Sequence, residues 1–322
     1  MTDFIKRVEY YLPEQTIDCL KLDKDKPDWG IADKLSKTGV RLLHHAAKDE
    51  STLDIAEKAA RKALEGLEEL PDTLIVCTQT PDMMLPHCSA MLQDRLKLPT
   101  STKCFDINLG CSGFGYSLAT AYSYLESGLS KRVLLVTADN YSKIISPDDP
   151  KCFVLFSDGA SACIIDKPEK KPVFHFGTDG SRNQAIKCKN SGISVVTENK
   201  AGDPIPAPRF EMDGYGVFLF TLGTIPDEIS KLLEKADLEL DDIDLFVFHQ
   251  ASRFVLESIG KKLNIPEEKM VIDLEEVGNT TSSSIPIAIK RATEKGRLQK
   301  GQKIMIFGFG IGLSWSGAVF DY

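Results

Sequence analysis

The sequence predicts an α/β protein built from two similar halves, and the first indication is an alternation of two kinds of segment. Short apolar runs, typical of buried strands, alternate with longer amphipathic runs, typical of helices with one apolar face. The predicted strands are residues 73–80, 131–140, 245–252 and 303–312. The predicted helices are residues 51–67, 112–128, 225–238 and 284–296. This alternation is typical of parallel sheets covered by helices on both faces.

A weak internal repeat is the second indication. When the strand at 73–80 is laid over the strand at 245–252, the same offset also aligns the next strand and two predicted helix starts. The residue pairs that fall together are Ile75 with Phe246, Val133 with Ile304, Asn108 with Asn279 and Cys111 with Ser282. The alternative is that apolar strands overlay one another by chance.

From this repeat we expect two halves, residues 1–170 and 171–322. The joint is expected near 167–175, where prolines and charges gather. The segment 175–208 is polar and rich in loop residues, so we expect an insertion there and no element of the core.

Bulk composition excludes several classes of protein. The chain has 322 residues, 42% of them apolar and 27% charged, with a formal net charge of −8. These values are typical of a globular protein and unlike a disordered or fibrous one. No dense run of Lys and Arg occurs, so we expect no nucleic-acid partner. Residues 1–16 lack a signal-peptide pattern, and no apolar run approaches the roughly 20 residues that span a bilayer, so we predict a cytoplasmic protein without a membrane partner.

The eight cysteines and five histidines follow no metal-binding pattern. Neither a C-x-x-C pair nor an H-E-x-x-H motif occurs, so we predict no metal site. Most of the cysteines lie inside apolar runs, as buried reduced cysteines do.

Cys111 differs from the other cysteines in its surroundings. It lies in FDINLGCSGFGYSLATA, residues 105–121, between a predicted strand and a predicted helix and among glycines. Small neighbours allow a sharp turn and the approach of a bulky electrophile. The unpaired N–H groups of a helix N-terminus lower the pKa of a thiol. We therefore expect a nucleophile that forms a thioester, and the alternative is a buried structural cysteine.

Two polar residues of the C-terminal half hold comparable positions. His249 ends the apolar run LFVFHQA, and Asn279 precedes a predicted helix in EEVGNTTSSSIPIAI. Polar residues at the carboxyl ends of parallel strands face a shared crevice. As neutral donors, both side chains can stabilise an enolate oxygen that forms only during a reaction. From the residues alone, a buried structural histidine and an ordinary Asn helix cap remain open.

A glycine-rich loop, FGFGIGLSW at residues 307–315, follows a predicted strand of the C-terminal half. G-x-G spacing alone is weak evidence for nucleotide binding, and this loop does not open a nucleotide-binding unit. We expect the backbone N–H of Ile311 to form an oxyanion hole with that of Cys111.

Together these motifs resemble the β-ketoacyl-acyl carrier protein synthase III family of the thiolase superfamily. DINLGCSGFGYSL, LFSDGASA, VFHQAS, GNTTSSSIP and GFGIGLSW occur in that family's order, and VEYYLPEQTID and KTGVR are similar to its start. The resemblance covers nearly the whole chain. It implies a thiolase-like five-layer αβαβα fold made of two pseudo-symmetric halves. It also implies an acyltransferase that condenses an acyl thioester with a malonyl thioester, with loss of carbon dioxide, through an acyl-cysteine.

The resemblance also implies roles for individual residues. Cys111 matches the acyl-accepting cysteine, and Ile311 matches the second oxyanion donor. His249 and Asn279 match the pair that promotes malonyl decarboxylation. Leu85, in PDMMLPHCSA, matches the tip of a loop that walls the acyl pocket of the partner in a homodimer. The implied substrates are thioesters of coenzyme A and of acyl carrier protein, without a cofactor or a metal.

Several positions that contact substrate in the family depart from its pattern. After HQA the family usually has Asn and, two residues later, Arg; here these are Ser252 and Phe254, with Arg253 between them. Lys37 replaces the Arg that is usual before TG, and Trp29 matches the entrance tryptophan with altered spacing. We expect all five residues to contact substrate, although Lys and Arg hold phosphate differently.

Lys261 and Lys262, in GKKLN, match part of the family's basic surface for docking the carrier protein. A solvated helix face is the alternative. Two further functions stay open from the sequence. One is transfer of the acyl group to an alcohol or amine without decarboxylation, and the other is a non-catalytic carrier-binding subunit.

Overall fold

The computed structural model describes residues 3–192 and 206–322, and two sheets form its centre. In the first sheet, with order β1-β7-β6-β4-β5, the strands β5, β4 and β6 are parallel, and β7 and β1 are antiparallel to their neighbours. Its strands are β1 (Ile5–Tyr11), β4 (Thr73–Cys77), β5 (Lys103–Ile107), β6 (Arg132–Asp139) and β7 (Gly159–Asp166). In the second sheet, with order β11-β12-β13-β8, only β11 and β12 are parallel. Its strands are β8 (Val173–Thr178), β11 (Leu245–Phe248), β12 (Lys303–Gly310) and β13 (Ser314–Asp321).

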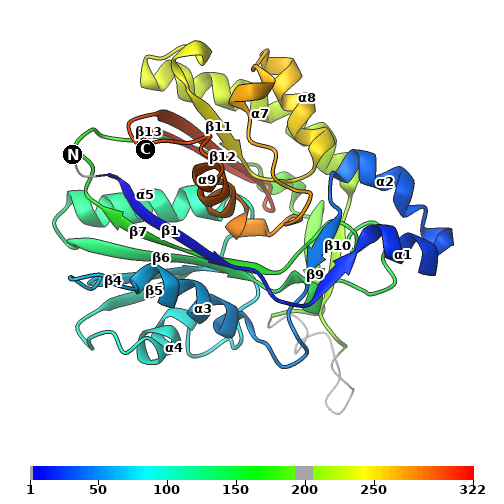
Figure 1. Cartoon of the computed structure of the whole chain (residues 1–322), viewed down its shortest axis with the longest axis horizontal. Coiled ribbons are helices and arrows are strands. Elements are labelled where there is room, and N and C mark those ends of the chain that lie inside the picture. Colours follow the sequence, from blue (N-terminus) through cyan, green and yellow to red (C-terminus); the bar gives the residue numbers. More distant parts are fainter. Residues whose placement is uncertain (1–2, 193–205) are drawn as a thin grey trace.

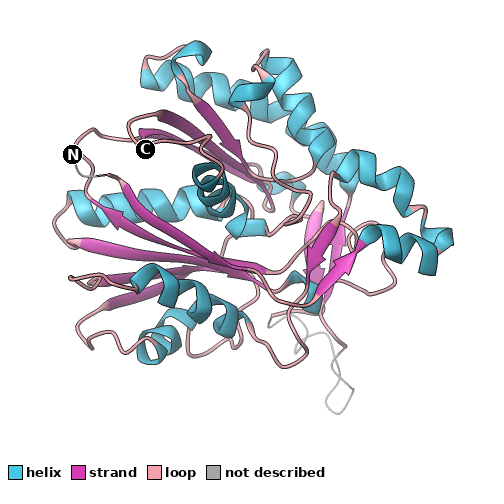
Figure 2. Cartoon of the chain, in the orientation of Figure 1, coloured by secondary structure: helices cyan, strands magenta, loops and turns pink. Residues whose placement is uncertain are grey.

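Helices separate and cover the two sheets, which gives five layers (Figure 1, Figure 2). α5 (Gly113–Glu126) and α9 (Ser284–Glu294) lie between the sheets and pack on strands of both. α3 (Thr52–Leu64) and α4 (Cys88–Arg95) cover the outer side of the first sheet. α7 (Gly214–Ala236) and α8 (Arg253–Leu263) lie on the outer side of the second sheet. The order of layers is the αβαβα order that we expected.

Local sequence explains the main elements. All of β4 is buried and β6 is buried beyond its first residue, as continuous apolar strands covered on both faces require. α3 begins with a capping box between Ser51 and Asp54 and turns its alanines toward the sheet. α5 and α9 bury aliphatic and aromatic side chains because a sheet lies on either side of them.

Short elements complete the described part of the chain. They are β2 (Thr16–Asp18), β3 (Leu42–His44), β9 (Ile186–Lys189), β10 (Arg209–Met212), α1 (Cys19–Asp25), α2 (Ile31–Thr38) and the 3-10 turns η1 (Pro27–Trp29), η2 (Tyr141–Lys143), η3 (Gly180–Arg182), η4 (Leu240–Asp242), η5 (Glu267–Lys269) and η6 (Thr281–Ser283). β2 pairs with β3 and β9 pairs with β10, each as a separate two-stranded sheet.

The expectation that segment 175–208 lies outside the core is wrong for its first residues. β8 pairs with β13 and is therefore a strand of the second sheet. It is an edge strand that stays partly exposed, so its sequence lacks the continuous apolar run of a central strand. Residues 193–205 of the segment lie outside the described residues.

The helix predicted at 225–238 begins much earlier, since α7 starts at Gly214. Pro226 inside this helix conceals the helical pattern and leaves the carbonyl of Leu222 without its usual N–H partner. The Lys262 ammonium on α8 donates to that oxygen at 2.7 Å. Tertiary contact thus replaces the hydrogen bond that proline removes.

The strands of the first sheet end at Asp166, and those of the second sheet begin at Val173. The predicted boundary between residues 170 and 171 falls in the connection between them, and the division into two pseudo-symmetric halves stays a prediction. Among the described helices, none combines the length and apolar character needed to cross a membrane.

Candidate active site

Cys111 lies in the turn that leads from β5 into α5, where its side chain is only 7% exposed. The turn passes so close to β4 that it tolerates no larger residue at Gly113. A β-carbon there would lie 2.4 Å from the Cys77 sulfur. The glycines around Cys111 therefore let this turn pack against the first sheet.

The end of β12 brings His249 beside Cys111. A β-carbon at Gly308 would lie 2.5 Å from the Cys111 carbonyl oxygen, and one at Gly310 would lie 2.9 Å from the Cys111 sulfur. β11 runs parallel to β12, and His249 follows β11 directly. The His249 backbone N–H donates to the carbonyl of Phe307 at 2.9 Å. Cys111 and His249 therefore flank the same end of β12.

Asn279 reaches this place from the segment before α9. Its side-chain Oδ1 accepts the backbone N–H of Thr281 at 2.9 Å, an Asx turn just before η6, whose N-cap is Thr280. The same contact leaves the amide nitrogen as a donor, and Nδ2 lies 3.4 Å from the carbonyl oxygen of Ala251. Ala251 in turn donates its N–H to the carbonyl of His249 at 2.8 Å. Three motifs that are distant in sequence thus meet at one place.

The Cys111 thiol is protonated at neutral pH. Burial, with the nearby Asp139 carboxyl, raises the pKa of Cys111 to about 12, although the N–H groups of Cys111 itself and of Ile311 hydrogen-bond to the sulfur and oppose this shift. The expectation of a lowered pKa is therefore wrong. The N–H of Gly113, the first in α5, already donates to the carbonyl of Gly110 at 2.7 Å, so it is not available to a thiolate.

His249 is a neutral imidazole. Burial lowers the pKa of His249 to about 3. The Nδ1 atom lies 2.7 Å from the hydroxyl oxygen of Ser284. The ring also packs edge-to-face on Phe309, with centroids 5.7 Å apart. These contacts hold the imidazole in one orientation beside Cys111.

Asp139 is a buried residue that the sequence reasoning missed. Its Oδ2 accepts the hydroxyls of Thr281 at 2.7 Å and Ser282 at 2.5 Å, and its Oδ1 accepts the backbone N–H of Gln79 at 2.8 Å. Burial raises the pKa of the Asp139 carboxyl above its ordinary value. This network ties β6 of the first sheet to the segment that carries Asn279. The place of Asp139 at the carboxyl end of a buried strand was the signal in the sequence that could have identified this residue.

Four predicted substrate-contact residues lie where α2 meets α8. Ser252 caps the first turn of α8 with its side chain. Arg253 packs against Gly39 at the end of α2, where a β-carbon would lie 2.7 Å from Arg253 Cβ. Lys37 occupies the last turn of α2, and Phe254 is half exposed on α8. The structure therefore gathers these residues at one junction of helices.

Trp29 and Leu85 have contrasting surroundings. The Trp29 ring packs edge-to-face on Phe153, with centroids 5.8 Å apart, and the Lys26 ammonium lies 4.0 Å from the ring centroid. Both contacts on the Trp29 ring are therefore made by residues of this chain, one near in sequence and one distant. Leu85 is 85% exposed, next to the exposed Met84.

The two predicted docking lysines also differ. Lys261 is exposed on α8. Lys262 is exposed as well, but its ammonium donates to the Leu222 carbonyl in α7. Lys262 therefore makes a contact that joins α8 to α7.

Aromatic rings form a wall beside Asn279. The rings of Tyr141, Phe156 and Phe210 lie 5.3 to 5.4 Å from one another, and Phe156 forms a β-bridge with Asn279. The Tyr141 hydroxyl donates to Gln79 Oε1 at 3.0 Å. Gln79 also lines a cavity of about 820 Å³, whereas the three rings and Asn279 are not among the lining residues of that cavity. The rings themselves are buried and belong to a hydrophobic core cluster.

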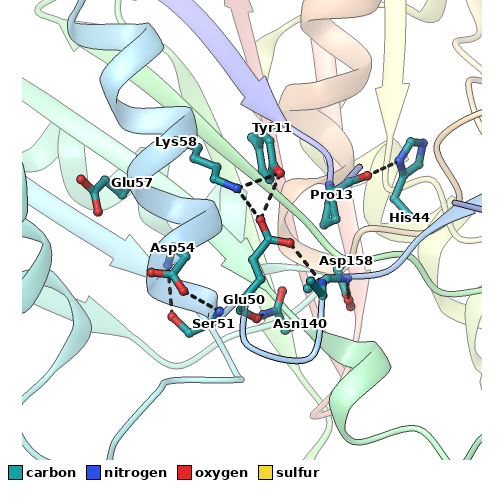
Figure 3. Close-up of polar contacts among 12 residues, drawn as sticks. Tyr11, Pro13, His44, Glu50, Ser51, Asp54, Glu57, Lys58, Asn140 and Asp158 are labelled. Carbon is teal, nitrogen blue, oxygen red and sulfur yellow. Dashed lines mark hydrogen bonds and ion pairs between the residues drawn. The ribbon is translucent and has the colours of Figure 1, made fainter. Parts of the chain in front are cut away.

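A second cavity, of about 580 Å³, lies along β1 and α3, and its lining residues include Tyr11, Glu50 and Lys58, whose polar contacts Figure 3 shows. Acidic side chains predominate in its lining, and some of them are paired. The Lys58 ammonium donates to Glu50 at 2.6 Å and to the Tyr11 hydroxyl at 2.9 Å, and that hydroxyl donates to Glu50 at 3.0 Å. These contacts tie α3 to β1. Within residues 3–192 and 206–322, no group of three or more His, Cys, Asp or Glu could hold a metal ion.

Comparison with protein families gives two matches. Residues 105–180 match the model for 3-oxoacyl-[acyl-carrier-protein (ACP)] synthase III, and residues 233–322 match the model for its C-terminal part. The chain is 33% identical over 317 residues to a β-ketoacyl-[acyl-carrier-protein] synthase III of Neisseria meningitidis serogroup C, with 97% of each protein covered. It is 34% identical over 317 residues to the protein of the same name from Clostridioides difficile, covering 96% of this chain and 95% of that protein.

Solved structures give the same result for the fold. A crystal structure of a 3-oxoacyl-(acyl-carrier-protein) synthase III superposes with a TM-score of 0.90 at 37% identity and covers 99% of both chains. The corresponding synthase from Thermus thermophilus superposes with a TM-score of 0.87 at 31% identity, again over 99% of both chains. The predicted thiolase-like fold class is therefore confirmed.

Proposed function

The chain belongs to the β-ketoacyl-[acyl-carrier-protein] synthase III family, and from that premise we propose that Cys111, His249 and Asn279 carry out its reaction. The protein is an acyltransferase of the decarboxylating, condensing type. An acyl group is first loaded from a thioester. A malonyl thioester then loses carbon dioxide and attacks the loaded acyl group, which gives a β-ketoacyl product.

Cys111 accepts the acyl group in the first half-reaction. Its sulfur attacks the carbonyl carbon of the incoming thioester, and the new carbon–sulfur bond replaces the old one. Because the raised pKa keeps the thiol protonated, the proton passes to the thiolate that departs. The N–H groups of Cys111 and Ile311, which hydrogen-bond to the sulfur in the free enzyme, hold the carbonyl oxygen as it becomes an oxyanion.

His249 and Asn279 act in the second half-reaction. Both donate a hydrogen bond to the thioester oxygen of the malonyl group, so that loss of carbon dioxide leaves an enolate that they stabilise. The enolate carbon attacks the acyl carbonyl, the carbon–carbon bond forms, and Cys111 departs as a thiolate that takes up a proton. Because both donors are neutral, they favour the developing charge over the uncharged ground state.

The convergence of Cys111 and His249 on one end of β12 is the observation that most supports this proposal. Intact-protein mass spectrometry after exposure to a panel of acyl thioesters tests the first half. We expect a mass increase that Cys111→Ala abolishes while the fold persists. We expect His249→Ala and Asn279→Ala to load acyl groups but to release neither carbon dioxide nor β-ketoacyl product. Condensation at the wild-type rate by Asn279→Ala would contradict its role.

We further propose that the donors are coenzyme A and carrier-protein thioesters and that they enter at the α2–α8 junction. Lys37, Arg253, Phe254 and Lys261 lie on this side of the molecule, on α2 and α8. Titration with coenzyme A and with carrier protein separates the two donors, because charge reversal at Lys261 is expected to weaken only the second. The eight free cysteines fit the reducing cytoplasm that we propose as its location.

We propose a homodimer in which the segment around Leu85 meets the partner. Leu85 and Met84 are exposed apolar side chains next to each other, which is typical of an interaction surface. Light scattering of the wild type and of Leu85→Glu tests this. A monomeric wild type would contradict it. The division at residues 170 and 171 into two pseudo-symmetric halves is likewise proposed, and superposition of one half of the backbone on the other tests it.

A further inference from the structure

The proton position on the His249 ring decides what this residue can do. With the proton on Nε2, the ring donates from Nε2 and accepts at Nδ1; with the proton on Nδ1, these capacities are exchanged. Nδ1 is engaged by Ser284, so Nε2 is the nitrogen that is left for substrate. The stabilisation of an enolate needs a donor at that atom.

The hydrogen bonds of Ser284 distinguish the two tautomers of His249. Its hydroxyl oxygen lies 2.7 Å from His249 Nδ1 and accepts the backbone N–H of Gln250 at 3.4 Å. The hydroxyl has one proton to donate. Among the hydrogen bonds that the described residues form, His249 Nδ1 is the one acceptor for that proton.

The opposite arrangement leaves a buried donor without a partner. If Ser284 accepted a proton from Nδ1, its own hydroxyl proton would point at no acceptor in a site where the residue is 2% exposed. An unpaired buried donor is costly, so the arrangement in which Ser284 donates is strongly favoured.

We propose that Ser284 is a positioning residue that donates its hydroxyl proton to His249 Nδ1 and so keeps the tautomer whose Nε2–H donates to the enolate oxygen. This inference rests on the proposed function, because a donor at Nε2 has a use only where an oxyanion forms. It also separates the two half-reactions. A ring that carries its proton on Nε2 cannot take the Cys111 proton there, so acyl loading does not need Ser284, whereas condensation does.

Nitrogen NMR of the whole enzyme labelled with [¹⁵N]histidine tests the tautomer directly. The chain has five histidines, and the His249 signals are those missing from His249→Gln. We expect a protonated Nε2 and an unprotonated Nδ1 that accepts a hydrogen bond. A proton on Nδ1 overturns the proposal, and this result does not depend on whether any Ser284 variant folds.

Kinetics of Ser284 variants test the role. We expect Ser284→Ala to lower condensation about tenfold or more while acyl loading stays near the wild-type rate, and Ser284→Thr, which keeps a hydroxyl, to recover part of the loss. Unchanged condensation in Ser284→Ala, or an equal fall in both half-reactions, overturns the proposal.

Ser283→Ala is the matched control. Its hydroxyl contacts Thr137 Oγ1 at 2.8 Å on the neighbouring strand, so its removal should leave the His249 spectrum unchanged. A wild-type enzyme that neither loads nor condenses acyl groups would refute the proposed function instead, and the NMR measurement would still decide the tautomer.

Discussion

Gly310 lies against Cys111, since a β-carbon at position 310 would lie 2.9 Å from both Cβ and Sγ of the cysteine. The two residues come from different halves of the sequence. The glycine-rich end of β12 therefore forms one wall of the nucleophile, and this explains a motif that is weak evidence for nucleotide binding.

Gly310→Ala should slow acyl loading strongly in a folded protein. The added methyl group would overlap the cysteine side chain, so either the sulfur or the end of β12 must move. We expect the rate of loading, followed by intact mass, to fall by about tenfold or more, since small displacements of reacting atoms are costly. Gly223→Ala is the control, because position 223 is exposed within α7 and has open space around it. Loading at the wild-type rate by Gly310→Ala would show that this contact is unimportant.

Alkylation of Cys111 by iodoacetamide should accelerate with pH without a plateau. Only the thiolate reacts, and burial raises the pKa of Cys111 to about 12. The rate should therefore rise about tenfold per pH unit between roughly pH 7 and 10, because the thiolate fraction does so. Peptide mass mapping, with Cys111→Ala as the blank, measures it. A plateau near pH 8 would mean that the helix start lowers the thiol pKa after all.

His249 should make the folded protein less stable in acid. Its folded pKa, about 3, lies below the unfolded value of about 6.5, so between these values the unfolded chain binds a proton that the folded chain does not. The free energy of unfolding therefore falls as the pH drops through this range, by about 2 kcal/mol at pH 5 from this group alone. Urea unfolding of the wild type and of His249→Asn at pH 7 and pH 5 should differ by this amount. Identical pH dependence in both proteins would mean that His249 has the same pKa in the folded and the unfolded chain, so that its imidazole is charged in the folded protein at pH 5.

Changes at Asp139 should affect condensation more than loading. Asp139→Ala leaves the Thr281 and Ser282 hydroxyls and the Gln79 N–H without their acceptor, so we expect a loss of stability of a few kcal/mol. Asp139→Asn keeps one oxygen, and the hydroxyls can rotate to accept from its amide, so it should be milder. Condensation should fall further than loading in Asp139→Asn, because the network holds the Asn279 segment. Equal losses would point to a general effect on folding.

Lys261 and Lys262 should separate docking from stability. Lys262→Met removes the donor to the Leu222 carbonyl in α7, so we expect a stability loss of about 1 kcal/mol with little change in KM for the carrier substrate. Lys261→Met should raise that KM and leave the urea midpoint unchanged. The reverse pattern would exchange the two roles.

The sequence by itself determined the class of fold and the residue types at the site. Continuous apolar runs predict β4, β6, β11 and β12 whatever their partners, since a strand buried on both faces must be apolar throughout. Cys111, His249 and Asn279 could be selected because polar residues directly after such strands, or before helices, face a common edge of the sheet.

Only the tertiary structure decided the contacts and the charges. β8 and the start of α7 escaped prediction because an edge strand and a proline-containing helix depend on neighbours that are distant in sequence. The protonation of Cys111 follows from burial between two sheets, which outweighs the two N–H groups at the sulfur, and no local pattern reports that balance. Ser284 meets His249 only when α9 packs on β11, and Asp139 meets Thr281 only when the two sheets pack around α5 and α9, because hydrogen bonds between distant segments are a property of the folded chain.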